Sequence, residues 1–183
     1  MTTMEKPRLP TVATAWLLLT APVVLLDAVF VLNRPKTPDT PHPLGELVLF
    51  QPWTVYATYD RRYAPNEDAF VVAQSWMNLL EVTLGLLAPL LSFSGYWKSA
   101  IKLAAVVSVM TFSKTLLYFV MDFVEGGEYT RHIGYLDKLL MVLLPSSVWI
   151  IVPFFTAIRC LQSLSQAGSP GSGDNSPKKR KNK

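Results

Sequence analysis

Four long apolar blocks decide what this chain can fold into. They cover residues 12–32, 71–93, 100–121 and 136–160. As an α-helix, each block can cross the roughly 30 Å of hydrocarbon in a bilayer. Half of the 183 residues are hydrophobic and only 16% are charged, which is too apolar for an ordinary soluble domain. We therefore predict an all-α fold, an integral membrane bundle of four transmembrane helices.

The two ends of the chain differ from the bundle in composition. The first block follows Lys6 and Arg8, as in a signal peptide, but no clear small-residue cleavage site follows it, so we expect it to be retained. We place the membrane domain at residues 12–162. Residues 163–183 are rich in Ser, Gly, Pro, Asn and Lys, a composition typical of disorder, and should form a basic tail.

Basic residues predict the orientation and the compartment. Lys98 and Lys102, the amino end and the tail hold more Lys and Arg than the two other loops, so both termini should be cytosolic. Residues 179–183 read KRKNK, which resembles the KxKxx signal for retrieval to the endoplasmic reticulum. A stop-transfer or anionic-lipid-binding cluster is the alternative. We predict a multi-pass protein of the endoplasmic reticulum membrane that does not bind nucleic acid, since no aromatic residues interleave the basic ones.

The apolar blocks contain four ionisable residues: Asp27, Glu81, Lys114 and Asp122. An isolated charge in the middle of a bilayer costs at least about 3 kcal/mol, so such residues normally face the bundle interior and pair, take up a proton or bind a ligand. Asp122 is near the end of its block, beside Glu125, and should be solvated. The other three residues are candidates for a site.

Asp27 and Glu81 are each flanked by apolar residues on both sides. We predict that one holds a proton near neutral pH while the other is ionised, an arrangement that can donate and accept protons. The alternative is structural, a buried ion pair with Lys114. We predict no metal and no cofactor, because His42 and His132 lie in loops and no Cys or His pair has ligand spacing.

The long first loop, residues 33–70, combines six prolines with several aromatic residues, and we expect it to cap the bundle at the membrane interface. It contains Trp53, Tyr56, Ala57, Asp60, Arg62 and Tyr63, in a pattern similar to the W-x-x-Y-A-x-x-D-x-R-Y of the emopamil-binding protein, a sterol Δ8-to-Δ7 isomerase. Residues 22–32, with Asp27, are similar to helix 1 of the sigma-2 receptor. The chain thus resembles the EXPERA domain family over most of residues 16–160.

Further matches extend this resemblance. Glu81 resembles the glutamate of the family's helix 2, Tyr118 matches helix 3, and Ser146 and Trp149 look like the N-x-x-W segment of helix 4. The family implies a four-helix protein of the endoplasmic reticulum with a cavity for sterols and cationic amphiphiles. In its isomerase branch an acid protonates a double bond and a base removes a proton on the other side of the resulting carbocation.

The resemblance implies roles for eight residues. It assigns catalysis to Asp27 and Glu81 and ligand binding to Trp149, Tyr118, Ser146, Lys114, Tyr56 and Trp53. Carboxylates and a tryptophan face stabilise a cation by charge and by cation-π attraction.

Two functions follow from the resemblance. One is a double-bond isomerase of a sterol or a sterol-like terpenoid. The other is a non-catalytic binder of sterols or cationic amphiphiles, because Val23 stands where the isomerase has a histidine and Ser146 where it has an asparagine. For either function we expect the protein to contact membrane lipids, and a homodimer is possible in both cases.

Overall fold

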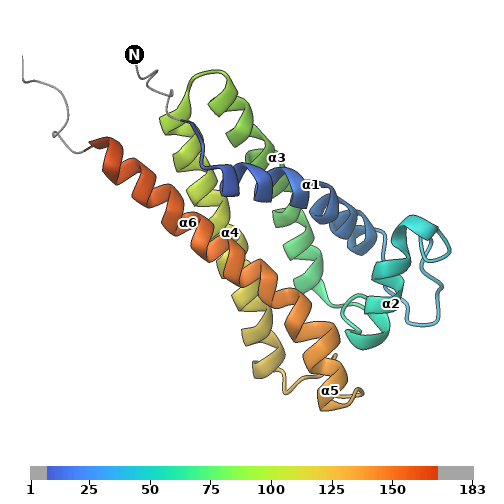
Figure 1. The fold of residues 1–183 in the computed structure, drawn as a ribbon. Helices are drawn as coiled ribbons and strands as arrows, with labels where there is room; N and C mark the ends of the chain where they lie inside the picture. Colours follow the sequence, from blue (N-terminus) through green and yellow to red (C-terminus); the bar gives the residue numbers. More distant parts are fainter. Residues whose placement is uncertain (1–7, 169–183) are drawn as a thin grey trace, which may run out of the picture.

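The computed structural model describes residues 8–168, and this part of the chain consists of helices and turns without a strand (Figure 1). The predicted all-α fold is confirmed. Four stretches are long and apolar enough to cross a membrane: α1 (Thr11–Leu32), α3 (Ala69–Phe93), α4 (Trp97–Val124) and a last stretch, Tyr135–Gln166.

The last span departs from regular α-helical geometry just before Pro145. It comprises α5 (Tyr135–Asp137), a π-helical turn η2 (Lys138–Leu143) and α6 (Leu144–Gly168). Pro145 has no N–H and its ring clashes with the carbonyl group four residues earlier, so a regular α-helical turn is disfavoured there. The wider turn accommodates the proline, and π-helical turns are frequent at functional sites.

The predicted disorder from residue 163 is wrong for the first part of the tail, because α6 continues to Gly168. Leu164 packs against the hydrophobic core, which favours helix beyond the expected end. The rest of the predicted tail, residues 169–183, lies outside the described residues.

The four long helices pack in chain order. α1 packs against α3, α3 against α4 and α4 against α6, whereas α1 makes few contacts with α6 (Figure 1). The helices of the bundle are closely packed at the end that holds the start of α1. Small side chains there, Ala13, Ala88 and Ala104, are fully buried and let the backbones approach closely. Cys160 is buried in the same core cluster.

The opposite end of the bundle carries two short helices in the first loop, η1 (Val48–Phe50) and α2 (Gln51–Tyr59). α3 then begins after Asp68, whose carboxylate accepts hydrogen bonds from the backbone N–H groups of Phe70 (3.2 Å) and Val71 (3.3 Å). Such a cap satisfies N–H groups that the first turn of a helix leaves free. α2 itself packs against η2, the start of the last span.

A buried arginine joins this loop to the end of α4. Arg62 is only 1% exposed and forms ion pairs with Asp68 (3.3 Å) and Glu125. Its guanidinium group also lies 4.5 Å from the centre of the Tyr129 ring, a cation-π contact. The loop is therefore fixed to α3 and α4 by charge and not only by apolar contacts.

Asp122, expected to be solvated, is instead paired. Its carboxylate accepts a hydrogen bond from Lys138 Nζ (2.6 Å) and another from Thr130 Oγ1 (2.8 Å). The pair connects the end of α4 to the start of the last span, which lies close to it in space but not in sequence.

Candidate functional site

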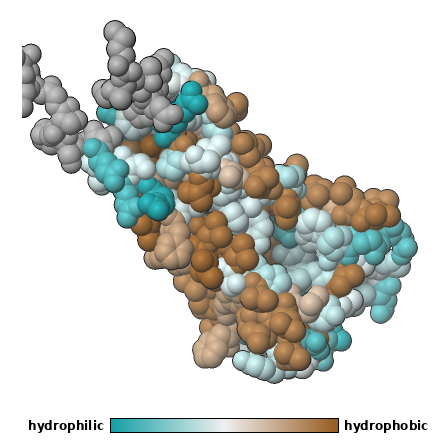
Figure 2. All heavy atoms as spheres, in the orientation of Figure 1, coloured by the Kyte–Doolittle hydropathy of each residue, from teal (hydrophilic) through white to brown (hydrophobic). Residues whose placement is uncertain are grey.

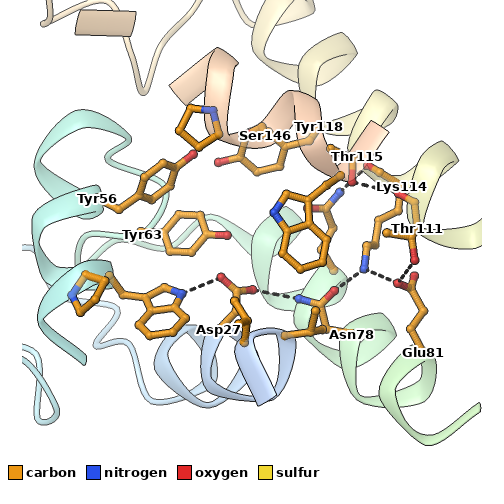
Figure 3. Close-up of a pocket in the computed structure, with 17 residues that line it drawn as sticks. Asp27, Tyr56, Tyr63, Asn78, Glu81, Thr111, Lys114, Thr115, Tyr118 and Ser146 are labelled. Carbon is orange, nitrogen blue, oxygen red and sulfur yellow. Dashed lines mark hydrogen bonds and ion pairs between the residues drawn. The ribbon is translucent and has the colours of Figure 1, made fainter. Parts of the chain in front are cut away.

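A cavity of about 290 Å³ lies at the loop end of the bundle, between α1, α2, α3, α4 and α6 (Figure 3). This volume is close to the lower end of the range of pockets that hold small organic ligands. The surface is hollowed between α6 and the part formed by α1 and α2 (Figure 2). The cavity is lined by all eight residues selected from the sequence: Asp27, Trp53, Tyr56, Glu81, Lys114, Tyr118, Ser146 and Trp149. Their roles remain predictions.

Asp27 projects from α1 into the cavity and is held by two neutral donors. Its carboxyl group accepts hydrogen bonds from Trp53 Nε1 and from Asn78 Nδ2, each at 2.9 Å. Within residues 8–168 it forms no salt bridge. Asp27 is therefore a carboxyl group that is fixed in direction without being neutralised by a cation.

Glu81 has a different environment on α3. Its Oε2 accepts hydrogen bonds from Lys114 Nζ (3.0 Å) and Thr111 Oγ1 (2.9 Å), both on α4. The Lys114 ammonium group also contacts Asn78 Oδ1. The structural alternative for Lys114 is thus realised, with Glu81 as its partner.

Asp27 and Glu81 are linked but not in direct contact. Asn78 donates to Asp27 and accepts from Lys114, so a chain of hydrogen bonds runs from Asp27 through Asn78 and Lys114 to Glu81 (Figure 3). Glu81 Oε1 is buried and has no hydrogen-bond partner among the residues that the structure describes. One carboxylate oxygen of Glu81 is therefore left without a hydrogen bond, although the residue itself lines the cavity.

Tyrosines line the side of the cavity nearest the loop. Tyr56 and Tyr63 meet edge to face, with ring centres 4.9 Å apart. Burial raises the pKa of both hydroxyl groups well above the ordinary value, and the carboxylates of Asp60 and Asp27 add to this effect. Both hydroxyl groups are therefore protonated at neutral pH, and that of Tyr56 donates a hydrogen bond to Asp60 Oδ2 (3.5 Å).

Asp60 supports this side of the cavity from outside the cavity wall. Its Oδ2 accepts a hydrogen bond from the Tyr118 hydroxyl group (2.5 Å), and its Oδ1 accepts one from the Arg62 backbone N–H (3.0 Å). Burial raises the pKa of Asp60, and these two hydrogen bonds lower it in part. Asp60 is 1% exposed and does not line the cavity, so it positions Tyr118 rather than contacting a ligand.

The remaining wall comes from the start of α6, directly after the π-helical turn. Pro145, Ser146 and Trp149 line the cavity there. The Trp149 ring meets Trp16 of α1 in an edge contact, with ring centres 5.2 Å apart and planes at 63°. This contact joins α1 to α6 beside the cavity, where the two helices otherwise separate.

Sequence reasoning did not select Asn78, Tyr63 or Thr111 as site residues. Asn78 and Thr111 each lie three residues before a selected residue, Glu81 and Lys114 respectively, and so share a helical face with it. That spacing is the signal that could have identified them. Tyr63 belongs to the first-loop pattern, but the pattern alone does not tell which of its members reaches the cavity.

The fold is a helical bundle whose four long spans are apolar enough to cross a membrane, and it holds a cavity lined by both polar and apolar side chains. The chain is similar to isomeliandiol synthase from Melia azedarach, with 25% identity over 166 residues that cover 89% of this chain and 74% of the synthase. No family model and no solved structure matches the chain. The resemblance to the EXPERA family therefore stays a prediction.

Proposed function

We propose that this protein is a membrane-embedded double-bond isomerase of a sterol or a sterol-like terpenoid. The observation that carries the proposal is Asp27, a carboxyl group that faces the cavity with only neutral hydrogen-bond donors as partners. A carboxyl group of this kind can hold a proton and deliver it to a carbon–carbon double bond. Glu81, the other carboxyl group that lines the cavity, is the acceptor that completes the reaction.

The reaction balances without a cofactor. The proton of Asp27 adds to one carbon of the double bond and leaves a carbocation at the other carbon. A C–H bond next to the cation then breaks, its electron pair forms the shifted double bond, and its proton passes to the Glu81 carboxylate. Glu81 then loses its proton to water, and Asp27 takes one up from water before the next turnover, so the substrate is isomerised with no net gain or loss of atoms.

The cavity wall suits a transient cation. The conjugate base of Asp27 and the π face of Trp149, which both line the cavity, attract positive charge. The Lys114 ammonium group would oppose it, but its charge is compensated by Glu81 at 3.0 Å. The ion pair thus keeps a cationic side chain from destabilising the intermediate.

The similarity to isomeliandiol synthase supports an enzyme, because that protein is named for the product that it makes. The name denotes a diol. We therefore include hydroxylated terpenoids beside sterols as substrates of the present protein, with the hydroxyl groups of Tyr56 and Tyr63, which line the cavity, as hydrogen-bond partners for an oxygen of the substrate.

Isotope labelling tests the proposed reaction. The purified protein, reconstituted in phosphatidylcholine vesicles in D₂O, should convert a Δ8-sterol or a polycyclic terpenoid alcohol into a positional isomer that carries a single deuterium. The label is expected because the proton that is added comes from an exchangeable carboxyl group, whereas the proton that is lost comes from the substrate. Protein-free vesicles are the control. Binding of both substrate classes without any isomer formed would contradict the proposal.

A non-catalytic binder is the second candidate. Val23, at the place of the isomerase histidine, is 44% exposed and offers no group that transfers protons. An ionised Asp27 surrounded by aromatic rings would instead bind the amine of a cationic amphiphile. This function needs the same cavity but predicts ligand binding without turnover.

We also propose that the protein lies in the endoplasmic reticulum membrane and that both of its termini face the cytosol. Lys98 and Lys102 at the start of α4 support this orientation, because basic residues accumulate on the cytosolic side. An N-glycosylation acceptor inserted beside Asp39, in the first loop, should be glycosylated in microsomes. The same acceptor placed beside Ser94, between α3 and α4, should stay unmodified, and the reverse pattern would show that the orientation is inverted.

A further inference from the structure

A segment of the first loop is more apolar than its position requires. Residues 47–59, which form η1 and α2, contain no Asp, Glu, Lys, Arg or His, although the loop is charged on both sides of them, from Lys36 to Glu46 and from Asp60 to Asp68. The segment is too short to cross a bilayer, which takes about 20 residues in a helix. An apolar segment of this length is either part of a protein core or lies at a membrane interface.

Its exposure excludes the core. Val48 is 87% exposed, Leu49 60% and Val55 48%. Phe50, between the exposed residues, is 6% exposed and packs against Phe30 of α1, with ring centres 6.1 Å apart. The segment is therefore firmly docked on the bundle through one side, while its aliphatic side chains point away from the protein.

The exposed side chains are continuous with the lipid-facing surface. In Figure 2 the hydrophobic surface along α1 extends onto the part of the molecule that holds η1 and α2. α1 itself presents Leu18, Leu19 and Leu25 outward, as a membrane span should. The apolar surface of α1 thus continues onto the segment, which contains no charged residue between Leu47 and Tyr59.

We propose that residues 47–59 form an interfacial anchor that inserts Val48, Leu49 and Val55 into the boundary between lipid headgroups and acyl chains. The partner is the bilayer itself, and the inference does not depend on the proposed function. The anchor has a second face: Trp53 and Tyr56 line the cavity, and Trp53 donates to Asp27. Lipid contact on one side of α2 therefore fixes the cavity wall on the other and places the cavity at headgroup depth.

Spin labels measure the depth of this segment. In a full-length Cys160→Ala background, Leu49→Cys is labelled and the protein is reconstituted in phosphatidylcholine vesicles. Collision rates with oxygen, which concentrates in lipid, and with a water-soluble nickel chelate then give the immersion of the label. Asp39→Cys, in the charged part of the same loop, is the aqueous control, and Leu19→Cys on α1 is the acyl-chain control. Val48→Cys is a second test position in case the label at residue 49 disturbs the fold.

We expect the labels at residues 48 and 49 to collide often with oxygen and seldom with the chelate, at a depth of about 5–10 Å below the headgroups. Frequent collisions with the chelate, as at residue 39, would overturn the proposal. Few collisions with either reagent would also overturn it, because they would show that another protein surface, such as a second copy of the chain, covers the segment.

Discussion

Replacing Asp27 by Asn should lower the isomerisation rate by about 10²- to 10⁴-fold, the usual contribution of a general acid. Asparagine keeps the size of the side chain and can still accept the hydrogen bond from Trp53, but it cannot supply the proton. The rate of isomer formation in vesicles measures the effect. Asp39→Asn, a substitution of an exposed loop carboxylate, is the matched control and should leave the rate unchanged.

The same variant separates the two candidate functions. If the protein is an isomerase, Asp27→Asn loses turnover and still binds the neutral substrate. If it is a non-catalytic binder, the wild-type protein shows no turnover, and the variant loses affinity for a cationic amphiphile. A variant that isomerises at the wild-type rate would show that Asp27 is not the acid.

Replacing Arg62 by Leu should lower the free energy of unfolding by about 3 kcal/mol, the lower end of the range for breaking a buried ion pair. The lower end applies because Asp68 and Glu125, which would lose their partner, are partly exposed, at 10% and 25% of the side chain. Unfolding of the detergent-solubilised protein by added SDS measures the change.

The neighbouring arginine provides a matched control for this prediction. Arg61 is exposed, and its side chain makes no hydrogen bond or ion pair within the described range of residues. Arg61→Leu should therefore change the stability by no more than about 0.5 kcal/mol. Equal losses of unfolding free energy in both variants would mean that the buried ion pairs of Arg62 do not stabilise the protein.

Some features of the candidate site could be predicted from the sequence and others could not. Asp27 and Glu81 stand out in the sequence, because a carboxylate within an apolar block is costly whatever the fold. Which of them Lys114 would pair with could not be predicted, since the three residues lie on three different helices. The structure pairs Lys114 with Glu81 and leaves Asp27 to neutral donors, and this difference is the basis for assigning the acid and the base.

The first loop shows a different limit of sequence reasoning. Its aromatic pattern marked Trp53 and Tyr56 as candidates. Asp60 belongs to the same pattern, but it does not line the cavity and instead accepts a hydrogen bond from Tyr118. A short helix such as α2 turns adjacent residues in different directions. The contacts of α2, such as the hydrogen bond from Trp53 to Asp27 and its packing against η2, involve residues far away in the sequence.

The sequence by itself determined that the chain is all-α, with four helices long and apolar enough to cross a membrane, because the length and apolarity of a span are properties of a continuous segment. Only the tertiary structure decided that Asp27, Glu81 and Trp149 share one cavity and how their charges are paired. The physical reason is that the rotation and the axial shift of each helix in the bundle depend on side-chain packing between segments far apart in the chain, which no local pattern records.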